Sequence, residues 1–269
     1  MKRLILCADD YAVAPGVSRA IRDLAASGRL NATSVMAPGP DLELEAAALK
    51  AIVPDGFRIG LHVTLTGGLT PLTLTAIGGV PARFTSLPWL MAHAHTGRLD
   101  QTAITDEVDA QFLRFAEAFG RPPAFVDGHQ HVHTLPVLRS IVLGALRRHA
   151  PGAFVRQCSG PRGAGEGIKA SLIAALSSGL SKEAARMGVP TNPAFSGAYD
   201  FKRSADFAAI FPRFLDGMPD GSLVMIHPGY VDDALRAVDP LTDAREHERA
   251  YLASDAFLQA LAQAGFRLG

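Results

Sequence analysis

The sequence predicts an α/β fold: an irregular (β/α) barrel of the TIM type, with about seven parallel strands joined by helical crossovers. Short apolar runs alternate with amphipathic segments along the chain, which is typical of a parallel sheet with helices between its strands. Acids and histidines follow several of these runs, as expected for the carboxyl ends of barrel strands. A length of 269 residues suits one large core, so we expect a single domain over residues 1–269.

Short runs rich in apolar and β-branched residues are expected to form the strands. These runs are Leu4–Ala8, Ala32–Ala37, Phe57–Val63, Ala124–Asp127, Ala153–Cys158, Leu223–His227 and Phe266–Leu268. Segments with apolar residues at helical spacing lie between them. These segments are Val17–Ser27, Leu42–Ile52, Ile104–Phe119, Leu135–Arg148, Leu172–Met187, Asp206–Leu215 and Glu246–Ala264.

Glycine, proline and a capping residue set several of the expected helix boundaries. Gly28 would end the first helix, and Thr134 is a candidate N-cap that precedes Pro136 in the first turn of the fourth. The segments 67–87 and 159–167 are rich in glycine and are expected to be loops, and 159–167 has no phosphate-binding pattern. The stretch that carries Trp89, His93 and His95 is expected to be irregular.

Composition and charge exclude several classes of protein. Lys plus Arg and Asp plus Glu both number 26, so the chain has no electrostatic footprint for nucleic acid. Two lone cysteines, Cys7 and Cys158, do not suggest a disulfide framework. The first apolar stretch stops at Asp9, short of the ~7–15 residues of a signal peptide, and no run approaches the ~18 of a membrane helix. We therefore expect a soluble cytoplasmic protein without a transmembrane segment; whether it forms a homo-oligomer is left open.

The first strand is expected to end in two adjacent acids, Asp9 and Asp10. Two buried carboxylates repel each other and lose hydration, and a nearby cation would resolve this. Read alone, the pair also fits a solvated loop start or a helix cap. His62 and His227 likewise end apolar runs, and each alone fits a histidine satisfied within the core.

A denser group of polar residues occupies the segment 127–133. Asp127, His129, His131 and His133 stand at every second position, which on an extended chain would place them on one side. Imidazoles pack poorly together but supply neutral nitrogen ligands for a divalent metal. All three histidines cannot bind one metal once the chain turns, so one or two would contact a ligand or the substrate. A solvated turn is the alternative interpretation.

Together the strand ends supply acids and histidines to one rim. A metal with one Asp and two His ligands keeps open positions for water and substrate. A second carboxylate can take a proton from that water, and a histidine on the opposite side can protonate a leaving group. These are the parts of metal-assisted hydrolysis.

Four motifs resemble those of the YdjC-like carbohydrate deacetylases, which include chitooligosaccharide and hopanoid-associated deacetylases. The motifs are Ala8-Asp9-Asp10-Tyr11, Gly60-Leu61-His62-Val63-Thr64-Leu65-Thr66, Asp127-Gly128-His129-Gln130-His131-Val132-His133 and His227-Pro228-Gly229. Their order and spacing span nearly the whole chain. One departure is Tyr11-Ala12, where the family has Phe-Gly. Because glycine permits a positive φ that alanine resists, we expect a different local loop here.

The resemblance implies removal of acetate from an N-acetylated sugar with a divalent metal, Mg²⁺ or Zn²⁺. It implies that Asp10, His62 and His129 bind the metal. It makes Asp9 the general base and His227 a candidate general acid, with His131 and His133 as supporting or substrate-contacting residues.

Two other classes remain as alternatives. Amidohydrolases and phosphoesterases often place a His-x-His pair after the first strand, where this chain has two acids. A non-catalytic sugar-binding relative could stack Trp89 or tyrosines on sugar rings, although binding alone needs no base.

Overall fold

The computed structural model describes residues 1–73, 83–161, 167–201 and 206–269, and of residues 167–173 only the backbone. Parts of the expected loops, residues 74–82 and 162–166, lie outside the described residues. None of the helices in the described part of the chain is both long and apolar enough to span a membrane.

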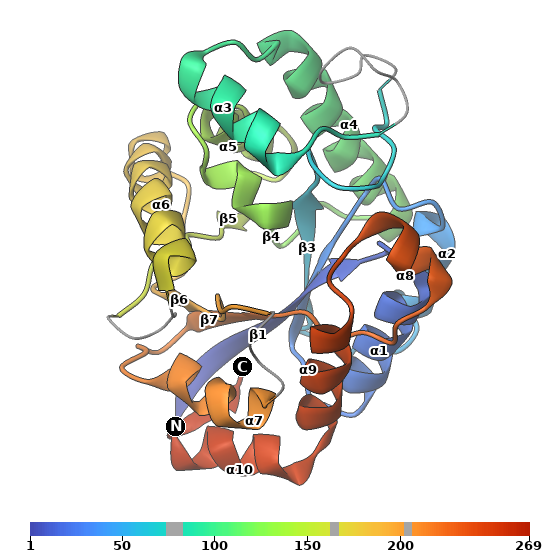
Figure 1. The fold of residues 1–269 in the computed structure, drawn as a ribbon, viewed down its shortest axis with the longest axis vertical. Helices are drawn as coiled ribbons and strands as arrows, with labels where there is room; N and C mark the ends of the chain where they lie inside the picture. Colours follow the sequence, from blue (N-terminus) through green and yellow to red (C-terminus); the bar gives the residue numbers. More distant parts are fainter. Residues whose placement is uncertain (74–82, 162–166, 202–205) are drawn as a thin grey trace.

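A curved parallel sheet forms the centre of the molecule (Figure 1). Its strands in the described chain are β1 (Lys2–Tyr11), β2 (Ala32–Val35), β3 (Arg58–Val63), β4 (Phe125–Gly128), β5 (Phe154–Val155), β6 (Phe195–Ser196), β7 (Ser222–Ile226) and β8 (Phe266–Leu268). The order is β5-β4-β3-β2-β1-β7-β6, and β8 pairs with the start of β1. A parallel bridge joins Val155 of β5 to Thr191, just before β6, so the sheet curls towards closure. This half-barrel confirms the expected TIM-like α/β class.

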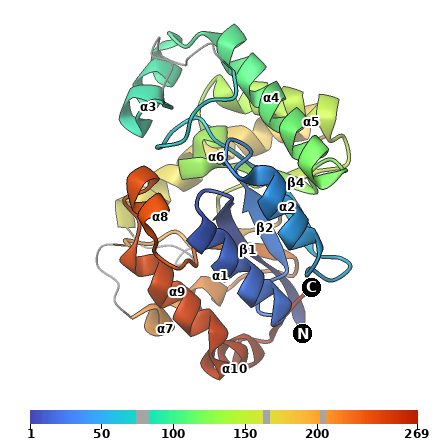
Figure 2. The same ribbon diagram turned by 90° about the vertical axis from the view of Figure 1, so that its right-hand side faces the viewer.

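Helices surround the outside of the sheet, and the two termini lie close together (Figures 1 and 2). The α-helices are α1 (Pro15–Ala26), α2 (Leu42–Lys50), α3 (Leu87–Thr96), α4 (Gln101–Phe119), α5 (Leu138–His149), α6 (Gly167–Met187), α7 (Phe207–Ile210), α8 (Asp233–Val238), α9 (Asp243–Ala253) and α10 (Asp255–Gln263). Two 3₁₀ segments are η1 (His129–Thr134) and η2 (Phe211–Leu215).

Several boundaries differ from those expected. The stretch around Trp89 is helix α3, with Pro88 in its first turn and Gly97 at its end with a φ of 66°, both ordinary helix signals. The last expected helix is divided into α9 and α10 because Ser254 is extended. Strand β6 has only two residues, too few for a periodic pattern to reveal. Short α8 was likewise not expected.

The alternation of side chains along β1 creates two apolar clusters. Leu4, Leu6 and Ala8 belong to the larger cluster, which the helices share with the sheet. Ile5 and Cys7 belong to a smaller cluster formed by strands and the segments that follow them. Because neighbouring strand residues point to opposite faces, the smaller cluster fills the concave side of the sheet. Both faces of β1 are therefore buried, and the strand delivers Asp9 and Asp10 to a buried rim.

The end of β1 adopts a left-handed backbone without glycine. The φ angles of Asp10 and Ala12 are 69° and 70°, and the pairing of β1 with β2 shifts register between Ala8 and Tyr11. The N–H of Ala12 donates to Ser18 Oγ at 3.0 Å, which holds this turn. Ala12 therefore has the positive φ that alanine was expected to resist, at a strain of roughly 1–2 kcal/mol for an alanine.

Replacing Ala12 by glycine should relieve that strain. Because glycine also gains backbone freedom in the unfolded chain, we expect Ala12→Gly to raise the free energy of unfolding by only about 0.5–1 kcal/mol. Denaturant unfolding would measure it. The matched control is Ala20→Gly within α1, which should lower stability by about 0.5–1 kcal/mol or more. Both alanines are buried, so a loss in Ala12→Gly as large as that in Ala20→Gly would show that this turn is not strained.

Candidate active site

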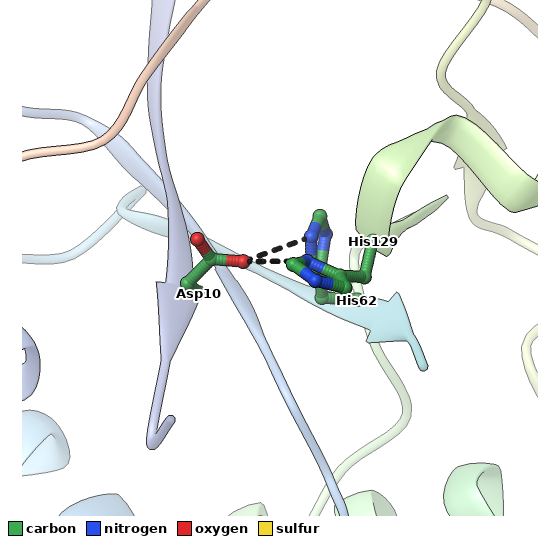
Figure 3. Close-up of side chains that lie close together, drawn as sticks. All are labelled: Asp10, His62 and His129. Atoms are coloured by element: carbon green, nitrogen blue, oxygen red, sulfur yellow. Dashed lines mark hydrogen bonds and ion pairs between the residues drawn. The ribbon is translucent and has the colours of Figure 1, made fainter. Parts of the chain in front are cut away.

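Three strand ends bring Asp10, His62 and His129 together (Figure 3). Asp10 lies near the end of β1, His62 on β3, and His129 begins η1 directly after β4. The Oδ1 atom of Asp10 is 3.1 Å from His129 Nδ1 and 3.3 Å from His62 Nε2. Asp10 and His62 are buried, while His129 is partly exposed.

This arrangement fits a divalent metal. One possible ligand atom from each of the three side chains lies within 4.8 Å of the other two. Ligand atoms bound at about 2.1 Å to one ion in tetrahedral or octahedral geometry are themselves roughly 3–3.5 Å apart. The separations from Asp10 Oδ1 to the two imidazole nitrogens match that spacing. The donor set of one carboxylate and two imidazoles is also a usual one for such ions.

A buried arginine occupies the neighbouring acidic cluster. Arg156 is fully buried after β5 and binds both oxygens of Asp9, through Nη1 at 2.7 Å and Nη2 at 2.6 Å. The same guanidinium forms an ion pair with Asp127, whose other oxygen lies 2.6 Å from His62 Nδ1. Cys7, Asp9 and Asp127 also lie within 4.8 Å of one another, but Arg156 already provides their positive charge.

A second buried arginine holds the free oxygen of Asp10. Arg245 on α9 is fully buried, and its Nη2 donates to Asp10 Oδ2 and to Asp239 Oδ2, each at 2.6 Å. The two carboxylate oxygens of Asp10 therefore have different partners: Oδ2 is fixed by the guanidinium, and Oδ1 faces the imidazoles. Gly229 packs on the aliphatic part of Arg245, where an added Cβ would lie 3.2 Å from Arg245 Cδ. The glycine of the His-Pro-Gly motif therefore leaves the space that the Arg245 side chain occupies.

These contacts determine the charge of each group. Burial alone would raise the pKa of Asp9 and Asp10, but Arg156 and Arg245 respectively lower it below the usual range, so both stay ionised. Burial also opposes a charge on His62, yet the Asp127 and Asp9 carboxylates raise its pKa to about 10. In the absence of metal, His62 is therefore protonated near pH 7. A metal would have to displace that proton.

His227 lies on the same cavity as the acids. A cavity of about 270 Å³ has Asp9, Asp10, His62, His129 and His227 in its wall. Burial lowers the pKa of His227 to about 4, so its imidazole is neutral near pH 7. The backbone N–H of His227 donates to the carboxylate of Glu248, which also accepts from the hydroxyl of Tyr199 at 2.7 Å.

The segment after β4 is not extended, and that expectation was wrong. Residues 129–134 form a 3₁₀ segment in which Gln130 and His131 have φ angles of 52° and 59°. The three histidines therefore point to different places. His129 faces Asp10, His131 lies on the cavity wall, and His133 is fully buried with Nε2 donating to Arg156 O at 2.8 Å. The turn connects β4 to α5 over a short distance, whereas a continued strand would carry the chain away from the rim of the sheet.

Arg156 and Arg245 were not identified from the sequence. Arg156 did leave a signal, since it is a charged residue within the apolar run 153–158. Arg245 left none, because it lies in a polar helix more than 230 positions from the acid that it contacts.

Comparison with known proteins decides the family. A model described as YdjC-like protein matches residues 3–263. The chain belongs to the YdjC-like family. This confirms the resemblance carried by the four motifs. Similar curated proteins include chitooligosaccharide deacetylases from Yersinia pestis (strain Pestoides F) and Yersinia pseudotuberculosis serotype O:1b (strain IP 31758). Each is 30% identical over 272 residues, which cover 100% of this chain and 97% of the relative.

Solved structures support the fold of this YdjC-like chain. A protein from Enterococcus faecalis V583 named for cellobiose-phosphate cleavage superposes with a TM-score of 0.77 at 20% identity, covering 100% of this chain and 97% of that one. A family 4 carbohydrate esterase from Streptomyces lividans, in complex with acetate, has a TM-score of 0.52 at 13% identity, with coverages of 100% and 92%. At these identities the likeness concerns the fold alone.

The charge of His62 predicts a pH dependence of stability. Its folded pKa is about 10 against 6.5 for the ordinary group, so its contribution is complete below pH 6.5 and is lost as pH rises towards 10. In chelator-treated protein, the stability of wild type relative to His62→Gln should therefore fall between pH 6.5 and 9. Urea unfolding of both at several pH values measures this. A constant difference across that range would mean that His62 is neutral without metal.

The role of Arg156 predicts a large effect of its removal. Arg156→Met leaves the Asp9 and Asp127 carboxylates buried without their cation, so we expect a loss of about 3–5 kcal/mol in the free energy of unfolding. The control is Arg148→Met, whose partner Asp109 is near the surface and whose loss should change stability by at most about 1 kcal/mol. Equal effects of the two substitutions would contradict the assignment.

Proposed function

We propose that this YdjC-like chain is a metal-dependent carbohydrate N-deacetylase, a hydrolase that cleaves the amide C–N bond of an N-acetylated sugar to give amine and acetate. The observation that carries the proposal is the single cavity shared by Asp10, His62 and His129 with Asp9 and His227. It combines a fitting metal site with an ionised carboxylate and an additional imidazole. The names of the curated relatives, chitooligosaccharide deacetylases, support the reaction class.

Asp10, His62 and His129 would hold the metal, which we expect to be Mg²⁺ or Zn²⁺. A bound divalent cation would polarise the amide carbonyl and lower the pKa of water at the site. The protein itself must then exclude competing ligands and move the protons.

Asp9 is proposed as the general base. Its pairing with Arg156 keeps it ionised. Oδ1 also accepts from Ser34 Oγ at 3.1 Å, so Oδ2 is the oxygen with a second lone pair that can accept a proton from water. The water oxygen bonds to the carbonyl carbon, the C–N bond breaks, and the departing amine needs a proton.

His227 is proposed as the proton donor to that amine. A neutral imidazole must first gain a proton, and we propose that it receives the one that Asp9 takes from water, since both residues line the same cavity. The carboxylates of Asp10 and Asp9 favour the charged form of the imidazole. A group with a pKa near 4 then releases the proton readily. We propose that His131, on the cavity wall, contacts substrate. His133 would have a supporting role, because it is buried and fixes the carbonyl of Arg156.

Substitution of Asp9 and of Asp10 should have different effects on metal binding and on the rate of acetate release. Asp9→Asn should keep metal affinity but lose acetate-release rate by roughly 10²–10⁴. Asp10→Asn should weaken metal binding by at least about tenfold and lower the rate as well. Metal titration and acetate release from N-acetylglucosamine oligomers would measure both, with Asp109→Asn as a control far from the cavity.

Near-normal turnover of metal-loaded Asp9→Asn would remove Asp9 as the base. Wild-type protein that binds metal but releases no acetate from any N-acetyl sugar would instead favour a sugar-binding relative without catalysis.

A further inference from the structure

Helix α4 contains two fully buried polar residues that the proposed reaction does not use. Glu107 and Gln111 are both 0% exposed, and they lie one helical turn apart, so their side chains are neighbours on one face of α4. Gln111 Nε2 donates to Glu107 Oε1 at 2.8 Å. Burying such groups costs free energy unless they are hydrogen-bonded. Within the described chain, their other partners belong to residues 64–73, the segment that follows β3.

The carboxamide of Gln111 completes the end of β3, the strand that carries His62. Thr64 is buried and lies beyond the last pairings of β3 with β2 and β4. Gln111 accepts from Thr64 N at 2.9 Å and donates to Thr64 O at 2.7 Å. Because a buried backbone donor or acceptor needs a partner, Gln111 takes the place of a neighbouring strand at Thr64. The hydroxyl of Thr64 in turn donates to His62 O at 2.9 Å.

Glu107 orients Gln111 and holds the far end of the same segment. A carboxylate only accepts hydrogen bonds, so the amide nitrogen of Gln111 faces Glu107, and the amide oxygen is left for the N–H of Thr64. Glu107 Oε1 also accepts from Leu72 N at 3.2 Å, and Oε2 accepts from Thr73 N and from the Thr73 hydroxyl, each at 2.9 Å. The two side chains of α4 therefore hold both ends of residues 64–73.

The middle of this segment lies beside the second imidazole of the proposed metal site. A Cβ added at Gly67 would lie 3.4 Å from His129 Nε2, and one added at Gly68 would lie 2.6 Å from Val238 Cα at the end of α8. Gly67 thus borders His129, while Gly68 leaves no room for a side chain against α8. A displacement of residues 64–73 would therefore change the surroundings of His129.

We infer that Gln111, oriented by Glu107, is a positioning residue of the metal site, which fixes the end of β3 at His62 and the backbone beside His129 (Figure 3). This inference rests on the proposed metal-dependent function. Neither Gln111 nor Glu107 is among the described residues of the cavity wall, so both act through the segment that they hold. Groups that orient metal ligands in this way affect metal affinity as well as rate.

The test uses Co²⁺ alone as the probe, because its visible absorption reports coordination without any turnover. Gln111→Met keeps the approximate size of the side chain but removes its hydrogen bonds to Thr64. We expect it to raise the Kd for Co²⁺ by roughly 10- to 100-fold and to change the visible spectrum of the bound ion. Circular dichroism establishes that each variant is folded under the conditions of the titration.

A second variant, Glu107→Gln, keeps the test possible if Gln111→Met does not fold. Whichever way the new amide is turned, its NH₂ group faces another donor, either Thr73 N or Gln111 Nε2. We expect a rise in Kd of at least about threefold from the lost hydrogen bonds. Because both residues act through one segment, the double variant should raise Kd by less than the product of the two single effects.

Two controls separate positioning from a general loss of stability. Asp109→Asn changes another acid of α4, whose partners Arg148 and His149 lie on α5. Phe257→Leu weakens buried aromatic packing between α10 and Phe211 and should lower the urea midpoint of unfolding. Both controls should leave the Kd for Co²⁺ and the spectrum unchanged. An unchanged Kd and spectrum in folded Gln111→Met and Glu107→Gln, or an equal rise in Phe257→Leu, would overturn the inference.

Acetate release is measured separately, so that this result stays distinct from the proposed function. A raised Kd in Gln111→Met, without acetate release by wild type, would support the positioning role and reject the deacetylase. Acetate release by wild type, with an unchanged Kd in Gln111→Met, would do the reverse.

Discussion

Two buried arginines allow four acids to gather at the rim of this sheet. Arg156 pairs with Asp9 and Asp127, and Arg245 pairs with Asp10 and Asp239. Unpaired, buried carboxylates would become protonated or would destabilise the fold, since desolvation disfavours their charge. The guanidiniums lower the pKa of Asp9 and Asp10 and leave one oxygen of Asp10 and one of Asp127 for other partners. The oxygen of Asp10 that Arg245 does not bind, Oδ1, faces the imidazoles of His62 and His129.

The arginines also give the two neighbouring acids different contacts. Asp9 has a guanidinium on both oxygens, whereas Asp10 has one oxygen on Arg245 and one near two histidines. His62 connects the two groups, because one nitrogen faces Asp10 and the other Asp127. A change in the charge of His62 is therefore felt by both carboxylate clusters. This coupling explains why a site built from ordinary residues holds a histidine whose pKa is raised to about 10.

Apolar periodicity and strand-end acids are local signals, so the sequence was sufficient to predict every strand of the described sheet except β6, and the residues at those strand ends. These signals placed Asp10, His62 and His129 at one rim, and the resemblance to the YdjC-like family singled out the three, which do meet. The partners of those residues could not be predicted from local signals, since a contact such as that of Arg245 with Asp10 depends on how distant elements pack. The histidine segment was misread for a related reason. Its alternation suggests a strand, but the space between β4 and α5 imposes a 3₁₀ turn that only the folded chain reveals.

Backbone strain lies in the same places as the site. In the described chain, the non-glycine residues with positive φ are Asp10, Ala12, Gln130, His131 and Val137. All belong to the two segments that carry Asp10 and His129. A regular strand would point Asp9 and Asp10 to opposite faces. The left-handed turn at Asp10, with the shift in register beside it, lets both side chains reach one cavity. Such conformations persist only where surrounding contacts determine them, and at Asp10 those contacts are the ion pair to Arg245 and the two imidazoles. The buried charges therefore hold the strained backbone in this one geometry.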